Sequence, residues 1–115
     1  FVIGLAKAFG RLQQATGILA QKGLSNPNEA GAAATDYLAL FGHVAVAFMW
    51  AKMAKIAFEK RDGDSSGFYK GKLKTARFFF ERILPETGAL FSMIMAGGES
   101  IMDMDDDLFG SAVAA

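Results

Sequence analysis

Apolar residues recur at helical spacing along most of the chain, and this spacing limits the possible folds more than any other feature. An amphipathic helix carries apolar residues every three or four positions, whereas a half-buried strand alternates apolar and polar residues. Steps of three and four connect mostly apolar residues along two stripes, and no long stretch alternates strictly. The first stripe consists of Val2, Leu5, Phe9, Leu12, Thr16 and Leu19, and the second of Tyr69, Leu73, Ala76, Phe80, Ile83, Thr87, Leu90 and Ile94. The sequence therefore predicts an all-α fold.

The helical pattern divides into three long helices, over about residues 1–22, 27–60 and 66–96. In the third segment the apolar steps keep their phase across Pro85, which favours one long helix kinked near Pro85 over two helices and a loop. Residues 99–102 add a short fourth turn. We expect a bundle of three long antiparallel helices in an up-down-up arrangement.

Local signals place the ends of these helices. Gly23 suits the left-handed C-cap of the first helix. Asn26 suits the N-cap of the second helix, and Glu29, three residues later, can accept a hydrogen bond from the backbone N–H of Asn26. Ser65 or Ser66 is placed to cap the third helix.

The second helix is apolar on nearly all sides between Tyr37 and Met53. Such a helix is normally surrounded by other helices. Its longest uncharged run, Tyr37 to Ala51, has fifteen residues, which is shorter than the roughly 20 residues that cross a bilayer. We therefore expect a buried core helix and no membrane span.

Length and composition fit one helical domain. The chain has 115 residues, of which 52% are hydrophobic, and it contains no cysteine. It begins at Phe1 with no initiator methionine, so we expect residues 1–115 to be one domain cut from a longer protein. The lack of cysteine excludes disulfides and thiol nucleophiles and favours a cytoplasmic protein.

The formal net charge of zero hides an uneven distribution. Residues 52–82 carry nine basic and four acidic side chains, and residues 83–115 carry six acidic side chains and no basic one. Phe78, Phe79 and Phe80 lie among five of these basic residues, and together they could contact nucleic acid. These five residues, which we call the basic block, are Lys70, Lys72, Lys74, Arg77 and Arg82. The phenylalanines lie at core spacing and acidic residues offset the charge, so we expect no nucleic-acid partner and an acidic tail at 103–115.

The motifs that could carry chemistry lack the partners that chemistry requires. Gly63–Gly67 matches G-x-S-x-G, but a predicted helix precedes it instead of a strand. His43 is the only histidine, and a satisfied core histidine is the simplest interpretation. The aspartates from Asp103 to Asp107 lack the turn glycine and the terminal glutamate of a calcium loop. We expect no catalytic, cofactor-binding or metal-binding residue.

The chain carries more large apolar side chains than three helices need. Three consecutive phenylalanines on one helix span about 200°, so they cannot all face one neighbour. Either other helices lie on both sides of the third helix, or it presents a second apolar face to a partner. The candidates for a contact with another domain or a second copy are Phe78, Phe79, Phe91, Met93, Met95, His43 and Trp50.

Several stretches resemble the extra C-terminal helical domain of a subgroup of bacterial acyl-CoA dehydrogenases that includes methylmercaptopropionyl-CoA dehydrogenase-like enzymes. The resemblance covers about residues 28–109 and is most specific from Ala76 to Glu86. Gly98 stands where alanine would be expected in this subgroup. The stretches that carry the resemblance are Tyr37–Ala45, Trp50–Ala54, Phe68–Tyr69, Lys72–Leu73, Ala76–Thr87 and Ala96–Met102.

The resemblance implies a parent flavoenzyme of fatty acid metabolism that oxidises acyl-CoA to enoyl-CoA. In that family FAD accepts a hydride from the β-carbon while a glutamate removes the α-proton, and these sites lie upstream of the appended domain. The chain would then be a non-catalytic accessory or assembly domain whose partners are the rest of the parent and a second copy, with acyl-CoA bound by the parent. The alternative is a stand-alone helical module that binds an acyl chain or acyl-CoA with its apolar interior and the basic residues of 70–82. A helical domain without a ligand is the third possibility.

Overall fold

The computed structural model describes residues 1–110, and every regular element in this part of the chain is helical. The prediction of an all-α fold is confirmed. The predicted acidic tail lies partly outside the described residues, from 111 onward. The α-helices are α1 (Val2–Ser25), α2 (Pro27–Lys60), α3 (Phe68–Phe78), α4 (Glu86–Met95) and α5 (Glu99–Met102), with a π-helix at Phe79–Ile83 and short 3-10 helices at Arg61–Gly63 and Asp106–Leu108.

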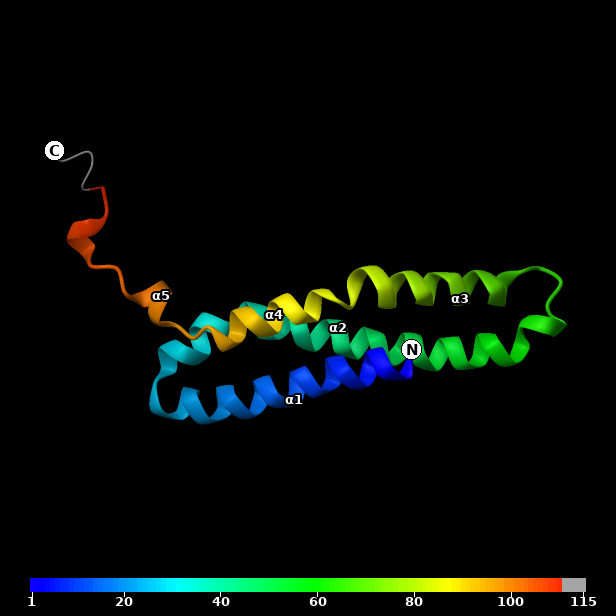
Figure 1. Cartoon of the computed structure of the whole chain (residues 1–115), viewed down its shortest axis with the longest axis horizontal. Coiled ribbons are helices and arrows are strands. Elements are labelled where there is room, and N and C mark those ends of the chain that lie inside the picture. The colour runs from blue at the N-terminus through cyan, green and yellow to red at the C-terminus, as the bar shows by residue number, and fades with distance from the viewer. Residues whose placement is uncertain (111–115) are drawn as a thin grey trace.

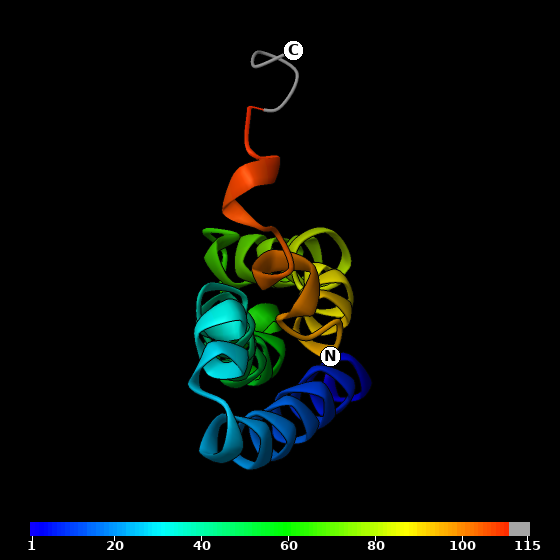
Figure 2. The same cartoon turned by 90° about the vertical axis from the view of Figure 1, so that its left-hand side faces the viewer.

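The helices form a long, thin molecule whose principal extents are 71, 35 and 15 Å. Figure 1 shows α2 running along the long axis, with α1 beside its first half and α3 beside its second half. From α3 the chain returns through α4, which lies over the first half of α2 (Figure 1). Seen from the end, α1, α2 and α4 lie at the corners of a triangle (Figure 2).

The turn between α1 and α2 follows local signals in part. The predicted N-cap is confirmed, because the side chain of Asn26 accepts a hydrogen bond from the backbone N–H of Asn28 at 3.1 Å. The predicted left-handed cap at Gly23 is wrong, since α1 continues to Ser25. The backbone N–H of Asn26 and the hydroxyl of Ser25 both donate to the carbonyl of Lys22, and this closes the helix without a glycine.

Glu29 has a tertiary partner instead of the predicted local one. The backbone N–H of Asn26 is already bonded to Lys22. The Glu29 carboxylate accepts a hydrogen bond from the backbone N–H of Gly98 at 3.0 Å. Gly97, beside it, has φ +79°, a backbone conformation that glycine adopts without strain. This hydrogen bond therefore connects the segment after α4 to the first turn of α2.

The predicted single helix over 66–96 is two α-helices separated by a π-helix. The backbone N–H of Leu84 donates to the carbonyl of Phe79, five residues back, at 2.8 Å. Pro85 has no N–H to continue the ladder, and the N–H of Thr87 donates to the carbonyl of Leu84 to begin α4. The chain thus changes its hydrogen-bond register just before Pro85, where we expected a kink.

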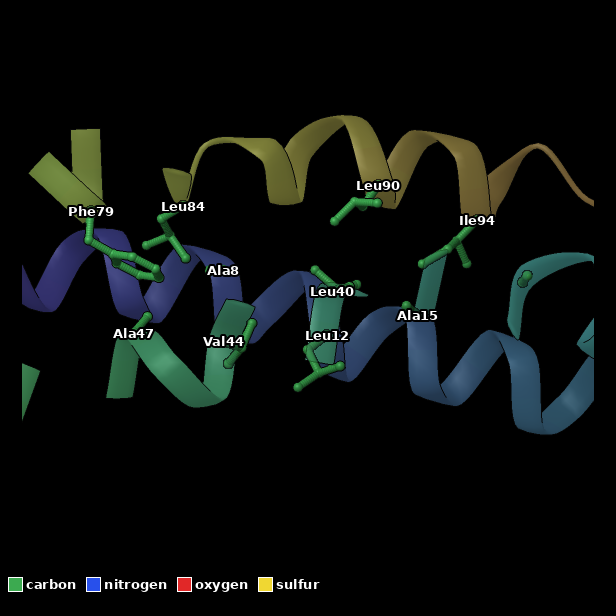
Figure 3. Close-up of a cluster of buried hydrophobic side chains, with 11 residues drawn as sticks. Ala8, Leu12, Ala15, Leu40, Val44, Ala47, Phe79, Leu84, Leu90 and Ile94 are labelled. Carbon is green, nitrogen blue, oxygen red and sulfur yellow. The ribbon is translucent and has the colours of Figure 1, made fainter. Parts of the chain in front are cut away.

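The core lies between α1, α2, the π-helix and α4 (Figure 3). Leu40 at its centre is completely buried, and Ala15 and Ala47 are also completely buried. These alanines let the helix backbones approach closely around the larger side chains. The buried cluster consists of Ala8, Leu12, Ala15, Ala33, Leu40, Val44, Ala47, Phe79, Leu84, Leu90 and Ile94.

The expectation that other helices surround α2 is wrong. Helices cover it on two sides, and large apolar side chains on its remaining surface are exposed. Leu38 is 72% exposed, Phe41 51% and Phe48 52%. A helix that is apolar all round while partly uncovered indicates a surface that another molecule or domain covers.

By length and composition, Pro27–Gly63 is one helical stretch that could cross a membrane, because an 18-residue window within it has a mean hydropathy of 1.4. This is weak support for a membrane span, because the core helix of a soluble protein passes the same test. The absence of a membrane span stays a prediction.

The loop before α3 is ordered around Asp64. Its carboxylate accepts hydrogen bonds from the hydroxyl of Ser66 at 2.6 Å and from the backbone N–H groups of Ser66 and Tyr69. The predicted N-cap at Ser65 or Ser66 is wrong, because the N-cap residue of α3 is Gly67. The Ser66 hydroxyl accepts a hydrogen bond from the backbone N–H of Phe68 from one position further out. The Ser66 hydroxyl first, and the Tyr69 N–H second, hold the pKa of Asp64 below its usual value.

Replacing Asp64 by asparagine should therefore reduce stability near neutral pH. The carboxylate contributes above its ordinary pKa of about 3.9, and this contribution disappears as the pH falls through the lowered pKa of the folded state. We expect the difference in urea midpoint between wild type and Asp64→Asn to shrink below about pH 4. Asp62→Asn, at a carboxylate that is 90% exposed, is the matched control and should show little difference. A difference that is constant down to the lowest pH would contradict this.

Candidate functional site

Two large apolar depressions lie between α1 and α2. The first has a volume of about 530 Å³ and is lined by Val2, Leu5, Ala6, Phe9, Leu12, Phe41, Val44, Ala45 and Phe48. The second has a volume of about 690 Å³ and is lined by Thr16, Leu19, Ala20, Ala30, Ala34, Tyr37, Leu38 and Phe41. We call the residues that line both depressions the α1–α2 face.

The polar atoms of the α1–α2 face are satisfied within the chain. The hydroxyl of Thr16 donates to the carbonyl of Leu12 at 2.7 Å, and it lies 2.7 Å from the hydroxyl of Tyr37. With its own proton directed to Leu12, Thr16 accepts the proton of Tyr37. Another surface could therefore cover this face without leaving a polar group unpaired.

The structure distributes the predicted contact residues over different environments. Phe79 is 7% exposed and belongs to the core, so it is not available as a surface contact. Phe91 and Met95 are half-buried and pack on the core. Phe78 and Met93 are about half exposed, at 57% and 50%. Within this set, Phe78 and Met93 remain accessible to a partner.

Trp50 is half-buried between the core and the basic block. The ammonium of Lys72 lies 5.7 Å from the centre of the Trp50 ring and 5.5 Å from that of Phe68, within the range of a cation–π contact. Nearby on α3, Arg77 pairs with Glu81 at 2.8 Å, and this carboxylate raises the pKa of Arg77. The basic block is thus partly engaged within the chain.

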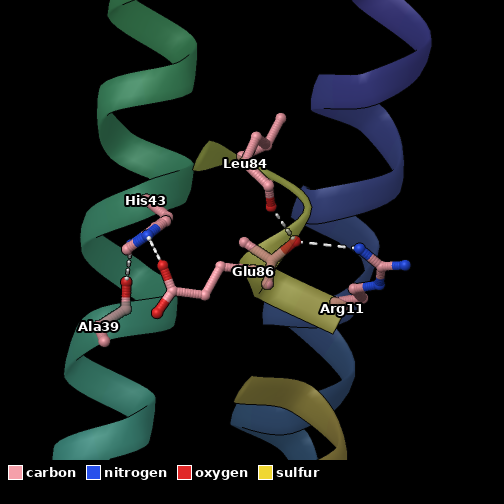
Figure 4. Close-up of polar contacts among 6 residues, drawn as sticks. Arg11, Ala39, His43, Leu84 and Glu86 are labelled. Carbon is pink, nitrogen blue, oxygen red and sulfur yellow. Dashed lines mark hydrogen bonds and ion pairs between the residues drawn. The ribbon is translucent and has the colours of Figure 1, made fainter. Parts of the chain in front are cut away.

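His43 links α2 to the first turn of α4 (Figure 4). Its Nδ1 donates to the carbonyl of Ala39 at 2.8 Å, and its Nε2 lies 3.1 Å from the carboxylate of Glu86. Both ring nitrogens have partners inside the chain. His43 therefore fits the interpretation as a satisfied structural histidine.

A double-mutant cycle on His43→Ala and Glu86→Ala should give a coupling energy of about 0.5–1 kcal/mol. The pair is modest because the Glu86 side chain is 60% exposed, where solvent screens the interaction. Urea denaturation of the two single variants and the double variant measures the coupling. A coupling energy above about 2 kcal/mol would contradict the assignment of this contact as a solvent-screened surface pair.

A second polar contact links α1 to the first turn of α4, close to the contact of His43 with Glu86 (Figure 4). Thr87 is completely buried, and its hydroxyl donates to the carbonyl of Leu84 at 2.7 Å while accepting from the guanidinium of Arg11 at 3.0 Å. The sequence pattern placed Thr87 on the apolar stripe but did not reveal Arg11 as its partner. The two contacts hold the start of α4 against both other helices.

None of these arrangements makes a reactive centre among residues 1–110. No cluster of three histidine, cysteine, aspartate or glutamate residues in this range could hold a metal. Ser65 lies in the loop between α2 and α3, where no histidine approaches it, since His43 is bonded to Ala39 and Glu86. The geometry supports contact and packing.

A comparison with known protein families identifies the chain. A family model described as acetyl-CoA dehydrogenase C-terminal like matches residues 1–105. The chain belongs to this family. No curated protein matches the chain significantly.

Membership of the acetyl-CoA dehydrogenase C-terminal-like family supports the resemblance to a C-terminal domain of acyl-CoA dehydrogenases. Enzymes of that kind hold FAD, which needs a cofactor-sized pocket with polar partners. No residue lining the two large depressions is charged. The depression beside Lys7 and Arg11 has a volume of about 160 Å³, smaller than the roughly 300–1,000 Å³ of a cofactor site. The described residues therefore do not fit FAD.

Proposed function

We propose that this domain is a non-catalytic accessory part of an FAD-dependent acyl-CoA dehydrogenase and that it contributes to assembly. The family match over residues 1–105 supports the parentage. The exposed α1–α2 face is the observation that carries the assembly role, because a free monomer rarely exposes an apolar surface this extended. Phe78 and Met93 add a smaller exposed apolar area on α3 and α4.

The proposal extends to the parent and its partners. The parent oxidises acyl-CoA to enoyl-CoA in the cytoplasm, and it belongs to the subgroup that includes methylmercaptopropionyl-CoA dehydrogenase-like enzymes. The resemblance from Ala76 to Glu86 supports the subgroup. Substrate and flavin bind to the parent, and this domain contacts the rest of the chain and a second copy.

The coding sequence upstream of Phe1 tests the parentage. We expect it to encode, in the same reading frame, a flavin-binding acyl-CoA dehydrogenase. An unrelated protein or a start codon directly before Phe1 would contradict the proposal.

A stand-alone module that binds an acyl chain is the second candidate, and the apolar depression of about 530 Å³ favours it. Lys52, whose ammonium lies 5.3 Å from the centre of the Phe48 ring, could pair with an anionic head group there. The basic residues of 70–82 count against this candidate as first conceived, because they lie on α3 and the π-helix and do not line the depression. Calorimetric titration with a long-chain acyl-CoA decides: heat and a thermal shift would favour the module, and their absence would remove it.

A further inference from the structure

The chain exposes more surface than a compact monomer of its size. Its accessible area is 8064 Å², whereas a compact monomer of 12.3 kDa exposes about 6,100 Å². The segment Glu99–Gly110, which projects from the helices (Figure 1), contributes to this excess. Partly covered helices contribute as well, since Leu38, Phe41 and Phe48 on α2 are each more than half exposed.

Among the described residues, α4 covers one side of the α1–α2 pair, and no element covers the α1–α2 face on the other side. Phe9, Phe41 and Phe48 on this face are each about half exposed.

The α1–α2 face is large enough for a dimer interface. It extends along α1, whose 24 residues are about 36 Å long at 1.5 Å per residue. Two adjacent helices are about 20 Å wide, so the face covers roughly 700 Å². A typical stable interface buries about 800 Å² on each partner.

The chemistry of the face suits contact with an identical face. In a two-fold dimer the same patch meets itself, so a charge close to the axis would face its own copy and a charge elsewhere would need an opposite charge on the same patch. No residue that lines either depression is charged. Thr16 and Tyr37 already satisfy each other. The face can therefore become dry against its own copy.

The shape of the face is also suited to its own copy. Phe41 forms a wall shared by the two depressions, so a half-exposed side chain stands with a hollow on either side. A two-fold axis near Phe41 would place each copy's aromatic side chains over the hollows of the other. We propose that a second copy of this chain covers the α1–α2 face, so that α1 and α2 of both copies form a four-helix core.

This inference rests on the assembly role proposed above and names its partner. Sedimentation equilibrium of the 115-residue chain tests it. We expect a mass twice the 12.3 kDa of the chain. Phe41→Glu should weaken the dimer at least 30-fold, because it places a charge at the centre of a dry interface.

Phe58→Glu is the matched control. Phe58 lies on the same helix and is 57% exposed, close to the 51% of Phe41, but it does not line either depression. Its dimer should be as tight as that of wild type. Circular dichroism shows whether each variant keeps its helices, so that loss of the dimer is separated from loss of the fold.

Spin labels give a measurement that does not depend on a disruptive variant. The chain has no cysteine, so Ala45→Cys places a single label on the α1–α2 face, and Ser65→Cys places one in the loop before α3. We expect a short intermolecular distance for the label at 45 and a much longer one for the label at 65.

Two results would overturn the inference. One is a monomeric wild-type chain, and the other is a dimer that Phe41→Glu leaves intact. If the wild-type chain is monomeric and binds the rest of the parent through the α1–α2 face, the parent covers this face instead of a second copy. None of these results bears on parentage, which the upstream coding sequence tests, so the two proposals fail separately.

Discussion

Leu40→Ala is expected to lower the free energy of unfolding by about 3.5 kcal/mol, the middle of the range for a buried leucine. Leu40 is completely buried at the centre of the core. The helices around it are fixed by the other core side chains and by the two polar contacts at the start of α4. These neighbours cannot collapse into the space that the side chain leaves. The variant therefore loses both the transfer free energy and the packing around a cavity.

Leu24→Ala is the matched control for this substitution. Leu24 lies near the end of α1 and is 90% exposed, so the same change should alter the unfolding free energy by less than about 0.5 kcal/mol. Urea denaturation at one fixed protein concentration compares the two variants. Equal effects at Leu24 and Leu40 would contradict the assignment of the core.

Thr87→Val should lower the free energy of unfolding by about 2–3 kcal/mol. Valine keeps the shape of the side chain but removes the hydroxyl. The carbonyl of Leu84 then loses a donor and the guanidinium of Arg11 loses an acceptor. The lost hydrogen bonds lie where α4 begins after the π-helix, so we expect α4 to unfold locally before the other helices do.

Thr75→Val separates this effect from the general cost of replacing a threonine in a helix. The hydroxyl of Thr75 donates to the carbonyl of Gly71, but the contact is exposed, so water can replace it. We expect a change below about 0.5 kcal/mol in chemical denaturation. Hydrogen exchange on Thr87→Val should show faster exchange in α4 than in the first half of α2, and uniform protection would contradict a local loosening.

Local signals were sufficient to predict where α2 begins. Asn26 and Pro27 act within one turn of the backbone, so the sequence reveals their role directly. Glu29 could not be predicted in the same way. Its partner, the N–H of Gly98, lies far away in the sequence, and the N–H of Asn26 that it was expected to bind is occupied by Lys22.

The break before Pro85 could not be read from periodicity because the chain offers apolar residues in two registers. Phe79 and Phe80 are adjacent, and so are Ile83 and Leu84. The predicted stripe used Phe80 and Ile83, whereas the structure buries Phe79 and Leu84 most deeply. The step of five between these residues is the π-turn, and it brings Thr87 back into the core.

The α1–α2 face was missed because its members are spread over two helices. Phe9 belonged to the predicted apolar stripe of the first helix, and Phe41 and Phe48 to a helix expected to be buried all round. The sequence shows an excess of apolar residues, but its clearest sign is the run of three phenylalanines in the third helix. Only the packing shows which apolar positions remain uncovered.

Equilibrium dialysis of the purified 115-residue chain against FAD, followed by an assay for reduction of an electron acceptor by acyl-CoA, separates an assembly role from a catalytic one. We expect no stoichiometric flavin and no acyl-CoA-dependent reduction, because the described residues offer no cofactor-sized polar pocket and no reactive cluster. One flavin bound per chain, or turnover with acyl-CoA, would contradict the account.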